Sequence, residues 1–276
     1  MASFKSVMGS RAVVALVRAG AVLFLAVTMV AAGFAACLLP QTTEALANAT
    51  VDTELSPFEH DDLVAGAVAT RDYSFFGHDE HALLAQVYTM NQHLAASGYK
   101  FPAGVSKPLV EQGVDPDGLS TDQLGDALYS ANVAYVLDEE AVSHLDDVHN
   151  VAVAAYVALG IIAILCVAAI AHVVFYRGWR GAWGVFAVAG GGLLVLFAVL
   201  GIVAAIDFYG FFTAFHSLFF TGDSWVFPID CLLICMLPEG FWMGMGAVWL
   251  AVTAVLAAAS LAAGLVLRKK GPAWLR

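Results

Sequence analysis

The sequence predicts an all-α polytopic membrane protein with four transmembrane helices and a mainly helical extracytoplasmic cap. Three observations predict this fold: four long apolar runs, basic residues gathered at one set of their ends, and a long acidic segment between the first two runs. Hydrophobic residues make up 61% of the 276 residues and charged residues 13%, whereas about 25% of a typical soluble domain is charged. This composition excludes intrinsic disorder and argues against a freely soluble enzyme.

Each apolar run is long enough to cross a bilayer as an α-helix. The hydrocarbon core is about 30 Å thick and a helix rises about 1.5 Å per residue, so roughly 20 residues suffice. No Asp, Glu, Lys or Arg interrupts the runs, and the second run contains one histidine, His172. The runs cover residues 19–39, 151–176, 181–206 and 241–267.

The first run has a second interpretation, as a signal peptide. It follows a basic start, and the later Ala45-Leu46-Ala47 resembles a cleavage site. However, the run is longer than the apolar region of most signal peptides, and Ala47 lies late for a cleavage point. We therefore expect a retained first helix.

The distribution of basic residues predicts the topology. Nine of the twelve Lys and Arg residues lie in three short segments that hold none of the 23 acidic residues. Under the positive-inside rule, both termini and the turn between the second and third helices are cytoplasmic. The basic residues of these segments are Lys5, Arg11 and Arg18, then Arg177 and Arg180, then Arg268, Lys269, Lys270 and Arg276.

Five regions follow from this topology. Residues 1–39 form the cytoplasmic N-terminus and the first transmembrane helix, and residues 40–150 form an acidic extracytoplasmic cap. Residues 151–206 hold the second and third transmembrane helices with their cytoplasmic turn. Residues 207–240 form an extracytoplasmic aromatic interfacial segment, and residues 241–276 form the fourth transmembrane helix and a basic cytoplasmic tail.

The cap region is large enough to fold as a small domain and holds 19 acidic residues against three basic ones. Apolar residues at spacings of three and four predict a helix over residues 80–96. A second helix is predicted over residues 119–128, with Ser120 or Thr121 as its cap. Three prolines between the two helices predict a loop over residues 98–118.

A histidine lies just before the second apolar run. Asp138 is the expected N-cap of a helix that continues into this run. On that helix Glu140, His144 and Asp147 share one face, and a carboxylate beside an imidazole fixes its tautomer and raises its basicity. The alternative interpretation of these residues is a solvated acidic helix end.

A second histidine lies in the aromatic segment after the third run. This segment is too apolar for a solvated connection, and we expect two short helices at the membrane surface. His216 shares a helical face with Phe212, Phe219 and Phe220. Burial among these rings lowers the pKa of a histidine, so His216 is expected to be neutral and able to accept a proton. The alternative is an aromatic belt with an incidental histidine.

The two histidines are expected to meet. The second and third helices are joined by a tight turn and are therefore expected to be antiparallel neighbours, which brings their outer ends together. His144 precedes one of these helices and His216 follows the other. Two histidines in different surroundings have separated pKa values, the arrangement of an acid and base pair.

At these residues the sequence resembles the bacterial lipoprotein intramolecular transacylase family, the Lit-like integral membrane proteins. The resemblance is carried by the stretch Leu137-Asp-Glu-Glu-Ala-Val-Ser-His144-Leu-Asp-Asp147-Val148 and by Phe215-His216-Ser-Leu-Phe219-Phe220 with Trp225, Asp230 and Pro238-Glu-Gly-Phe241-Trp242. It is specific over about residues 135–245 and extends loosely to the whole chain. Residues 40–135 match no motif of the family.

The resemblance implies an enzyme of the bacterial cell membrane that needs no cofactor or metal. It would move the sn-2 acyl chain of a diacylglyceryl lipoprotein to the α-amino group of the N-terminal cysteine. The implied catalytic residues are His144 and His216, with His216 as the base and His144 as the acid or carbonyl-polarising group. Glu140 and Asp147 would orient His144. The expected substrate pocket consists of Phe212, Phe215, Phe219, Trp225, Asp230 and Phe241.

Diacylglyceryl-modified lipoproteins and membrane lipids are the expected partners of a monomer. The net charge of −11 argues against nucleic-acid binding. The four cysteines are expected to be packing residues.

Three other classes are weighed against the transacylase. A non-catalytic sensor or interaction protein could use the acidic cap to bind a partner. A metal-dependent hydrolase could use His78, His81 and His60, although their order matches no recognised zinc motif. A transporter is disfavoured because helices two to four carry no Asp, Glu, Lys or Arg.

Overall fold

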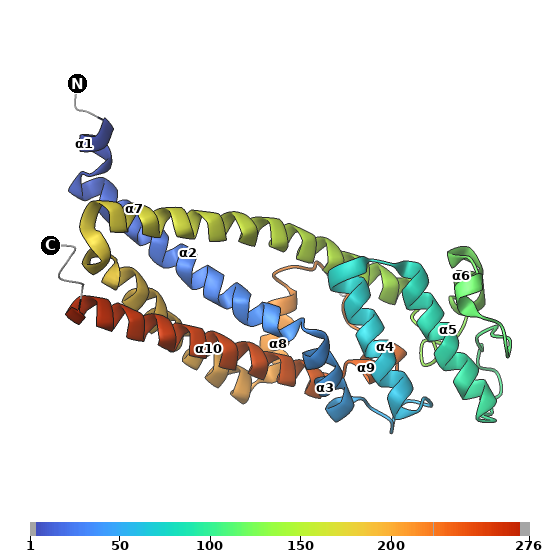
Figure 1. Cartoon of the computed structure of the whole chain (residues 1–276). Coiled ribbons are helices and arrows are strands. Elements are labelled where there is room, and N and C mark those ends of the chain that lie inside the picture. The colour runs from blue at the N-terminus through green and yellow to red at the C-terminus, as the bar shows by residue number, and fades with distance from the viewer. Residues whose placement is uncertain (1–3, 223, 271–276) are drawn as a thin grey trace. The chain divides into compact units, whose positions relative to one another are not determined.

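The computed structural model describes residues 4–222 and 224–270, and these form two compact units. We call residues 1–36, 155–211 and 247–276 the membrane unit, and residues 37–154 and 212–246 the cap unit. Every regular element in the described part of the chain is helical (Figure 1). The predicted all-helical class is therefore confirmed.

Three helices of the described chain are long and apolar enough to cross a membrane. They are α2 (Arg11–Cys37), α7 (Glu139–Ile206) and α10 (Glu239–Lys270), and a short α1 (Phe4–Met8) precedes them. The 68-residue α7 bends back on itself at Gly178, which has φ 67° and ψ 174° (Figure 1). Such a backbone is accessible to glycine and strained for other residues. The bend lies in the turn that the sequence predicts between the second and third apolar runs.

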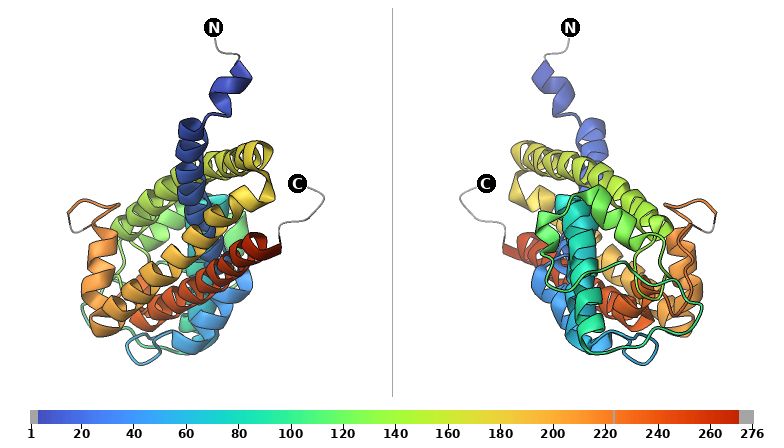
Figure 2. Two further views of the ribbon diagram at one scale, coloured as in Figure 1. Left: turned by 90° about the vertical axis from the view of Figure 1, so that its left-hand side faces the viewer. Right: turned by 90° about the vertical axis from the view of Figure 1, so that its right-hand side faces the viewer.

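Small residues let the helices of the membrane unit pack closely. A Cβ atom added at Gly190 would lie 2.3 Å from the Ala257 carbonyl oxygen, and one added at Gly264 would lie 2.6 Å from the Ala187 nitrogen. The Trp249 indole N–H also donates a hydrogen bond to the Val30 carbonyl at 2.9 Å. Close backbone approach of this kind is typical of membrane helices. As a result α2, both halves of α7 and α10 lie side by side (Figures 1 and 2).

The cap unit is a cluster of short helices around one apolar core. It contains the start of α7, the end of α8, and the start of α10. Its other elements are α3 (Pro40–Thr50), α4 (His60–Asp72), a π-helical turn (Tyr73–Gly77), α5 (Glu80–Ala96), a 3-10 turn (Pro116–Gly118), α6 (Thr121–Leu128) and α9 (Leu232–Met236), while α8 covers Phe208–His216.

Helix caps in the cap unit confirm several predicted boundaries. The predicted helix over residues 80–96 coincides with α5. Ser120 caps α6 in a reciprocal box with Gln123, and the Asp138 carboxylate accepts a hydrogen bond from the Ala141 N–H at 2.9 Å. The sequence did not predict α3, α4 or the π-helical turn. The inward face of α4 includes Gly66, Ala67 and Thr70, which produce little hydrophobic periodicity.

The second short helix of the aromatic segment was predicted to lie at the membrane surface, whereas the structure buries it in a protein core. In the structure α9 enters the core of the cap unit, where Leu232 and Met236 are fully buried. The Leu232 N–H donates to the Val133 carbonyl at 2.8 Å, and the Cys235 carbonyl accepts from the Asp52 N–H at 2.9 Å. The physical reason is that every side chain of α9 is apolar, and most of them pack into this core. The cap is therefore built from two separate stretches of sequence.

Candidate functional site

His144 lies on the first turns of α7, ahead of the apolar run that begins at Val151, and is only 8% exposed. Its ring centroid is 5.1 Å from that of Phe220 and 5.5 Å from that of Phe227. Burial, reinforced by the nearby His216, lowers the pKa of His144 to about 4, while Asp147 acts weakly in the opposite direction. His144 is therefore neutral near pH 7.

The Nδ1 atom of His144 is buried and has no hydrogen-bond partner in the described part of the chain. Buried polar atoms of proteins are nearly always hydrogen-bonded, and an exception calls for an explanation such as a bound ligand group. The unpaired Nδ1 therefore makes His144 a candidate site residue.

His216 is the last residue of α8, and its tautomer is fixed by the backbone. Because a carbonyl oxygen only accepts, the 3.0 Å contact with the Phe212 carbonyl means that Nδ1–H of His216 donates. The Nε2 atom then carries the lone pair. Burial lowers the pKa of His216, partly offset by this hydrogen bond. A neutral imidazole with a free Nε2 lone pair can accept a proton.

The cap unit brings the two histidines to the same phenylalanine. The Phe220 centroid is 5.1 Å from His144 and 5.8 Å from His216, so the imidazole centroids are separated by at most the sum of those two distances. Trp225 also lies against His216, with 4.9 Å between ring centroids. The residues converge from the start of α7, the end of α8 and the segment that follows α8.

The two carboxylates predicted to orient His144 are placed differently from the expectation. Glu140 and Asp147 are exposed, and Glu140 lines a cavity of about 120 Å³ together with Asp138 and Phe227. Neither carboxylate contacts the Nδ1 atom of His144, which has no partner among the described residues. Asp147 influences His144 through its charge, since it raises the pKa of that histidine. An orienting role for the carboxylates stays a prediction.

Some of the expected pocket residues contact the ring of His216, whereas others lie away from it. Phe212 and Phe215 lie 3.9 and 5.9 Å from the His216 ring. Phe219 contacts Phe215 and Phe220 from an exposed position, and Asp230 is exposed. Phe241 is 3% exposed and belongs to the core of the cap unit.

Phe220 and Phe227 were missed as neighbours of His144. The sequence carried a signal for Phe220, four residues after His216 on the aromatic face. It carried none for Phe227, whose position depends on the packing of the two separate stretches.

All four cysteines are buried and none forms a disulfide bond, as expected of packing residues. Burial raises the pKa of the Cys231 and Cys235 thiols, to about 11 for Cys235. The thiolate is the nucleophilic form of cysteine, so burial disfavours a cysteine nucleophile at these two positions.

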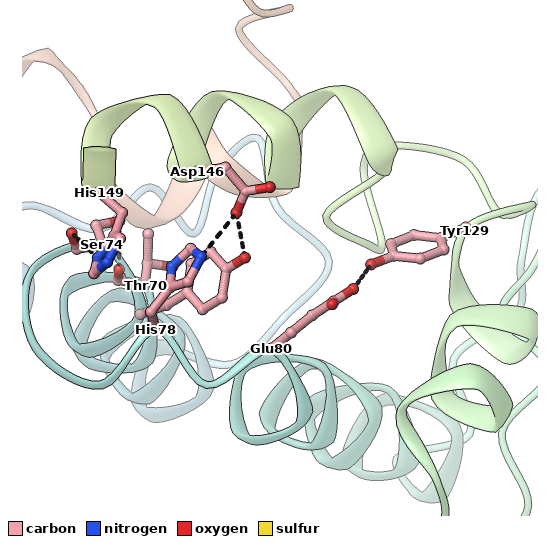
Figure 3. Close-up of polar contacts among 8 residues, drawn as sticks. Thr70, Ser74, His78, Glu80, Tyr129, Asp146 and His149 are labelled. Carbon is pink, nitrogen blue, oxygen red and sulfur yellow. Dashed lines mark hydrogen bonds and ion pairs between the residues drawn. The ribbon is translucent and has the colours of Figure 1, made fainter. Parts of the chain in front are cut away.

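The histidines considered for a metal site lie apart from the catalytic candidates. The Tyr73 hydroxyl donates a hydrogen bond to Asp146. His78 stacks on His149 (Figure 3), with 3.9 Å between ring centroids. The His81 ring instead meets the Leu119 carbonyl at 2.9 Å. Among residues 4–222 and 224–270, no three His, Cys, Asp or Glu side chains are placed to hold a metal ion.

Comparisons with known proteins agree with the sequence resemblance. The model of the family "Lipoprotein intramolecular transacylase Lit" matches residues 121–242, which include both histidines. The fold is similar to an in meso structure of the membrane integral lipoprotein intramolecular transacylase Lit from Bacillus cereus. The TM-score is 0.61 at 15% identity, and the match covers 95% of this chain and 98% of the other. A comparison with curated protein sequences gives no match.

Proposed function

We propose that this chain, a Lit-family membrane transacylase by the match of residues 121–242, moves the sn-2 acyl chain of a diacylglyceryl lipoprotein. The acceptor is the α-amino group of the lipoprotein's own N-terminal cysteine, and the product is a lyso-form lipoprotein. The observation that carries this proposal is the convergence of two neutral histidines, the buried His144 and the half-buried His216, on Phe220.

We also propose four membrane crossings, with α7 crossing once on each side of Gly178. Each half holds one apolar run of sufficient length. The basic residues near the bend and at both ends of the chain support a cytoplasmic position for these parts and the opposite side for His144 and His216. A lipoprotein substrate would then meet the site from the outer leaflet.

His216 is the base in this proposal. The amine has an ordinary pKa near 8, so part of it is neutral near pH 7, and this neutral form attacks the ester carbonyl. Its nitrogen must then lose one proton to become an amide, so a base is required. The Nδ1–H of His216 is held by the Phe212 carbonyl, which leaves Nε2 as the acceptor. His216 then passes the same proton to the glyceryl oxygen that leaves as the ester carbon–oxygen bond breaks. One bond forms, one breaks, and no outside proton or energy source is consumed.

His144 polarises the ester carbonyl. Burial holds this imidazole neutral, so in its resting state it donates a hydrogen bond through a ring N–H and does not act as a charged acid. A donor placed where negative charge develops can contribute about 3 kcal/mol to a reaction of this type. The partnerless Nδ1 of His144 is the atom available for that contact when it carries the ring proton.

The aromatic side chains around His216 would hold the two reacting ends of one substrate together. Phe212, Trp225 and Phe220 pack against the ring of the base. The amine and ester are joined by a flexible lipid linker, and fixing their orientation can supply about 7 kcal/mol of the barrier.

The test is the mass of a lipoprotein N-terminal peptide after expression in a bacterium that lacks its own N-acylating enzymes. Wild type should yield the lyso form, whereas His144→Ala and His216→Ala should insert normally and yield only the diacylglyceryl form. His78→Ala is the matched control, since this histidine lies in the separate cluster of Figure 3. Full product from either catalytic variant contradicts the assignment. No product from wild type favours the sensor interpretation.

A further inference from the structure

A groove of about 620 Å³ lies in the membrane unit, between α2 and both halves of α7. We call it the arginine groove, because four arginines line it: Arg11, Arg18, Arg177 and Arg180. None of its lining residues belongs to the cap unit that holds His144 and His216.

Within residues 4–222 and 224–270, no carboxylate pairs with the arginines of the groove. The only acidic residue of the membrane unit is Asp207, at the far end of the second half of α7. It lies 27 residues beyond Arg180, about 40 Å along a helix. No ion pair of the described residues includes any of the four arginines. A groove of this kind attracts an anion.

Two of the arginines are held in position by uncharged partners. The Arg18 guanidinium carbon lies 5.7 Å from the Trp183 ring centroid. A Cβ atom added at Gly184 would lie 1.7 Å from Arg18 Nη2, so only glycine leaves room for this side chain as placed. Arg177 donates to the Gly9 carbonyl at 3.2 Å and to the Tyr176 carbonyl at 3.3 Å. Since each guanidinium has five N–H donors, both arginines retain donors for a ligand.

The remaining lining of the groove is apolar and follows one face of α2. Arg11, Val14, Arg18 and Val22 recur at spacings of three and four, over about 16 Å of helix. Val173 and Val188 line it from α7. The groove therefore combines four cationic side chains with an apolar lining, which matches a lipid and not a soluble ion.

We propose that the arginine groove binds the phosphate headgroup of an anionic phospholipid, with the acyl chains along its apolar lining. Basic pockets between transmembrane helices are suited to such headgroups, and guanidinium groups bind phosphate oxygens through paired hydrogen bonds. A zwitterionic lipid is disfavoured because its ammonium group would approach four uncompensated arginines. This proposal is independent of the reaction proposed for the histidines.

The test measures lipid binding to the purified full chain in neutral detergent by native mass spectrometry. Dioleoylphosphatidylglycerol and dioleoylphosphatidylcholine are titrated in parallel. We expect the anionic lipid to bind more tightly, and Arg180→Gln to weaken it about tenfold, as for loss of a charge-assisted hydrogen bond. Arg11→Gln/Arg180→Gln should weaken it further. Lys269→Gln, which removes one positive charge from α10 outside the groove, should change binding less than about twofold.

Three results would overturn the proposal. The first is equal binding of the two lipids. The second is an equal loss in Arg180→Gln and Lys269→Gln, which would indicate a general charge effect. The third is release of the lipid by a large excess of inorganic phosphate, which would assign the groove to a soluble anion. Unchanged thermal unfolding of the variants without lipid shows that the loss is not misfolding.

Discussion

At the scale of single residues, Phe220 links the two histidines of the site. Its ring contacts both imidazoles, and it helps exclude water from His144. A smaller side chain at this position would free space beside both rings and loosen their alignment. The neighbouring Phe219 has the same side chain but is 48% exposed, which provides a matched comparison.

We predict that Phe220→Leu lowers lyso-lipoprotein formation about tenfold, because small misplacements of reacting groups are costly. Phe219→Leu should retain nearly full activity. The measurement is the rate of product formation by mass spectrometry at equal amounts of inserted protein. Equal rates for the two variants would contradict a role for Phe220 in aligning the histidines.

The lowered pKa of His144 has a consequence for stability. Its pKa is about 4 in the folded chain against 6.5 ordinarily, so between these values the unfolded chain binds a proton that the folded chain does not. The contribution of His144 is complete above pH 6.5 and decreases as the pH falls toward 4. The free energy of unfolding changes by at most about 1.4 kcal/mol per pH unit from one such group.

We predict that wild-type protein loses more thermal stability than His144→Gln when the pH is lowered from about 6.5 to about 4.5. The glutamine variant lacks the titrating group and should have the shallower slope. Thermal unfolding followed by intrinsic fluorescence in detergent measures both slopes. A steeper slope for the variant would show that His144 is not held neutral by the fold.

At the scale of elements, glycines decide how closely helices pack. In the cap unit, a Cβ atom added at Gly66 of α4 would lie 2.3 Å from the Met236 sulfur of α9 and 3.1 Å from the Met90 sulfur. In the membrane unit, Gly190 faces the backbone of α10 directly. A flexible methionine can yield to an added methyl group, whereas a backbone atom cannot move without shifting the whole helix.

We predict that Gly66→Ala destabilises the cap unit by about 1–3 kcal/mol through overpacking. Met236→Ala in the same chain should recover part of the loss, because the added methyl group then has space. Gly118→Ala is the control, since no atom lies within 4 Å of its added Cβ. Additive losses in the double variant would contradict direct contact between α4 and α9.

We predict that Gly190→Val impairs folding far more than Gly192→Val. The added side chain at position 190 meets the Ala257 carbonyl, whereas at position 192 nothing lies within 4 Å. The yield of monodisperse protein after extraction in detergent measures the difference. Equal yields would show that α7 and α10 do not pack through this glycine.

At the scale of the whole molecule, the four native cysteines are buried, which makes the topology testable with a thiol reagent. We predict that Lys107→Cys in the cap unit is labelled by a membrane-impermeant maleimide on intact cells. Lys269→Cys, the same exchange at the end of α10, should be labelled only after the membrane is opened. Labelling of both positions on intact cells would contradict the proposed topology.

The sequence predicts the parts of this molecule that depend on local chemistry. Apolar length predicts the long helices, Ser120 and Asp138 predict helix starts, and the aromatic spacing around His216 predicts its burial. The contacts of Phe227 with His144 and the entry of α9 into the core were not predictable in this way. They depend on long-range packing between residues 37–154 and 212–246, and no local sequence pattern shows which side chains of the two stretches meet.

The position of α9 has a consequence for the order in which the protein can be made. The residues that fill the space beside Gly66 and Met90 are synthesised after most of the cap and after the whole of α7. If the cap is extracytoplasmic, as proposed, a nascent chain that has exported only its first stretch still has an incomplete apolar interior. In the proposed topology the cap would therefore mature late in biogenesis, when the segment after α8 has also crossed the bilayer, and that step would assemble the histidine pair as well.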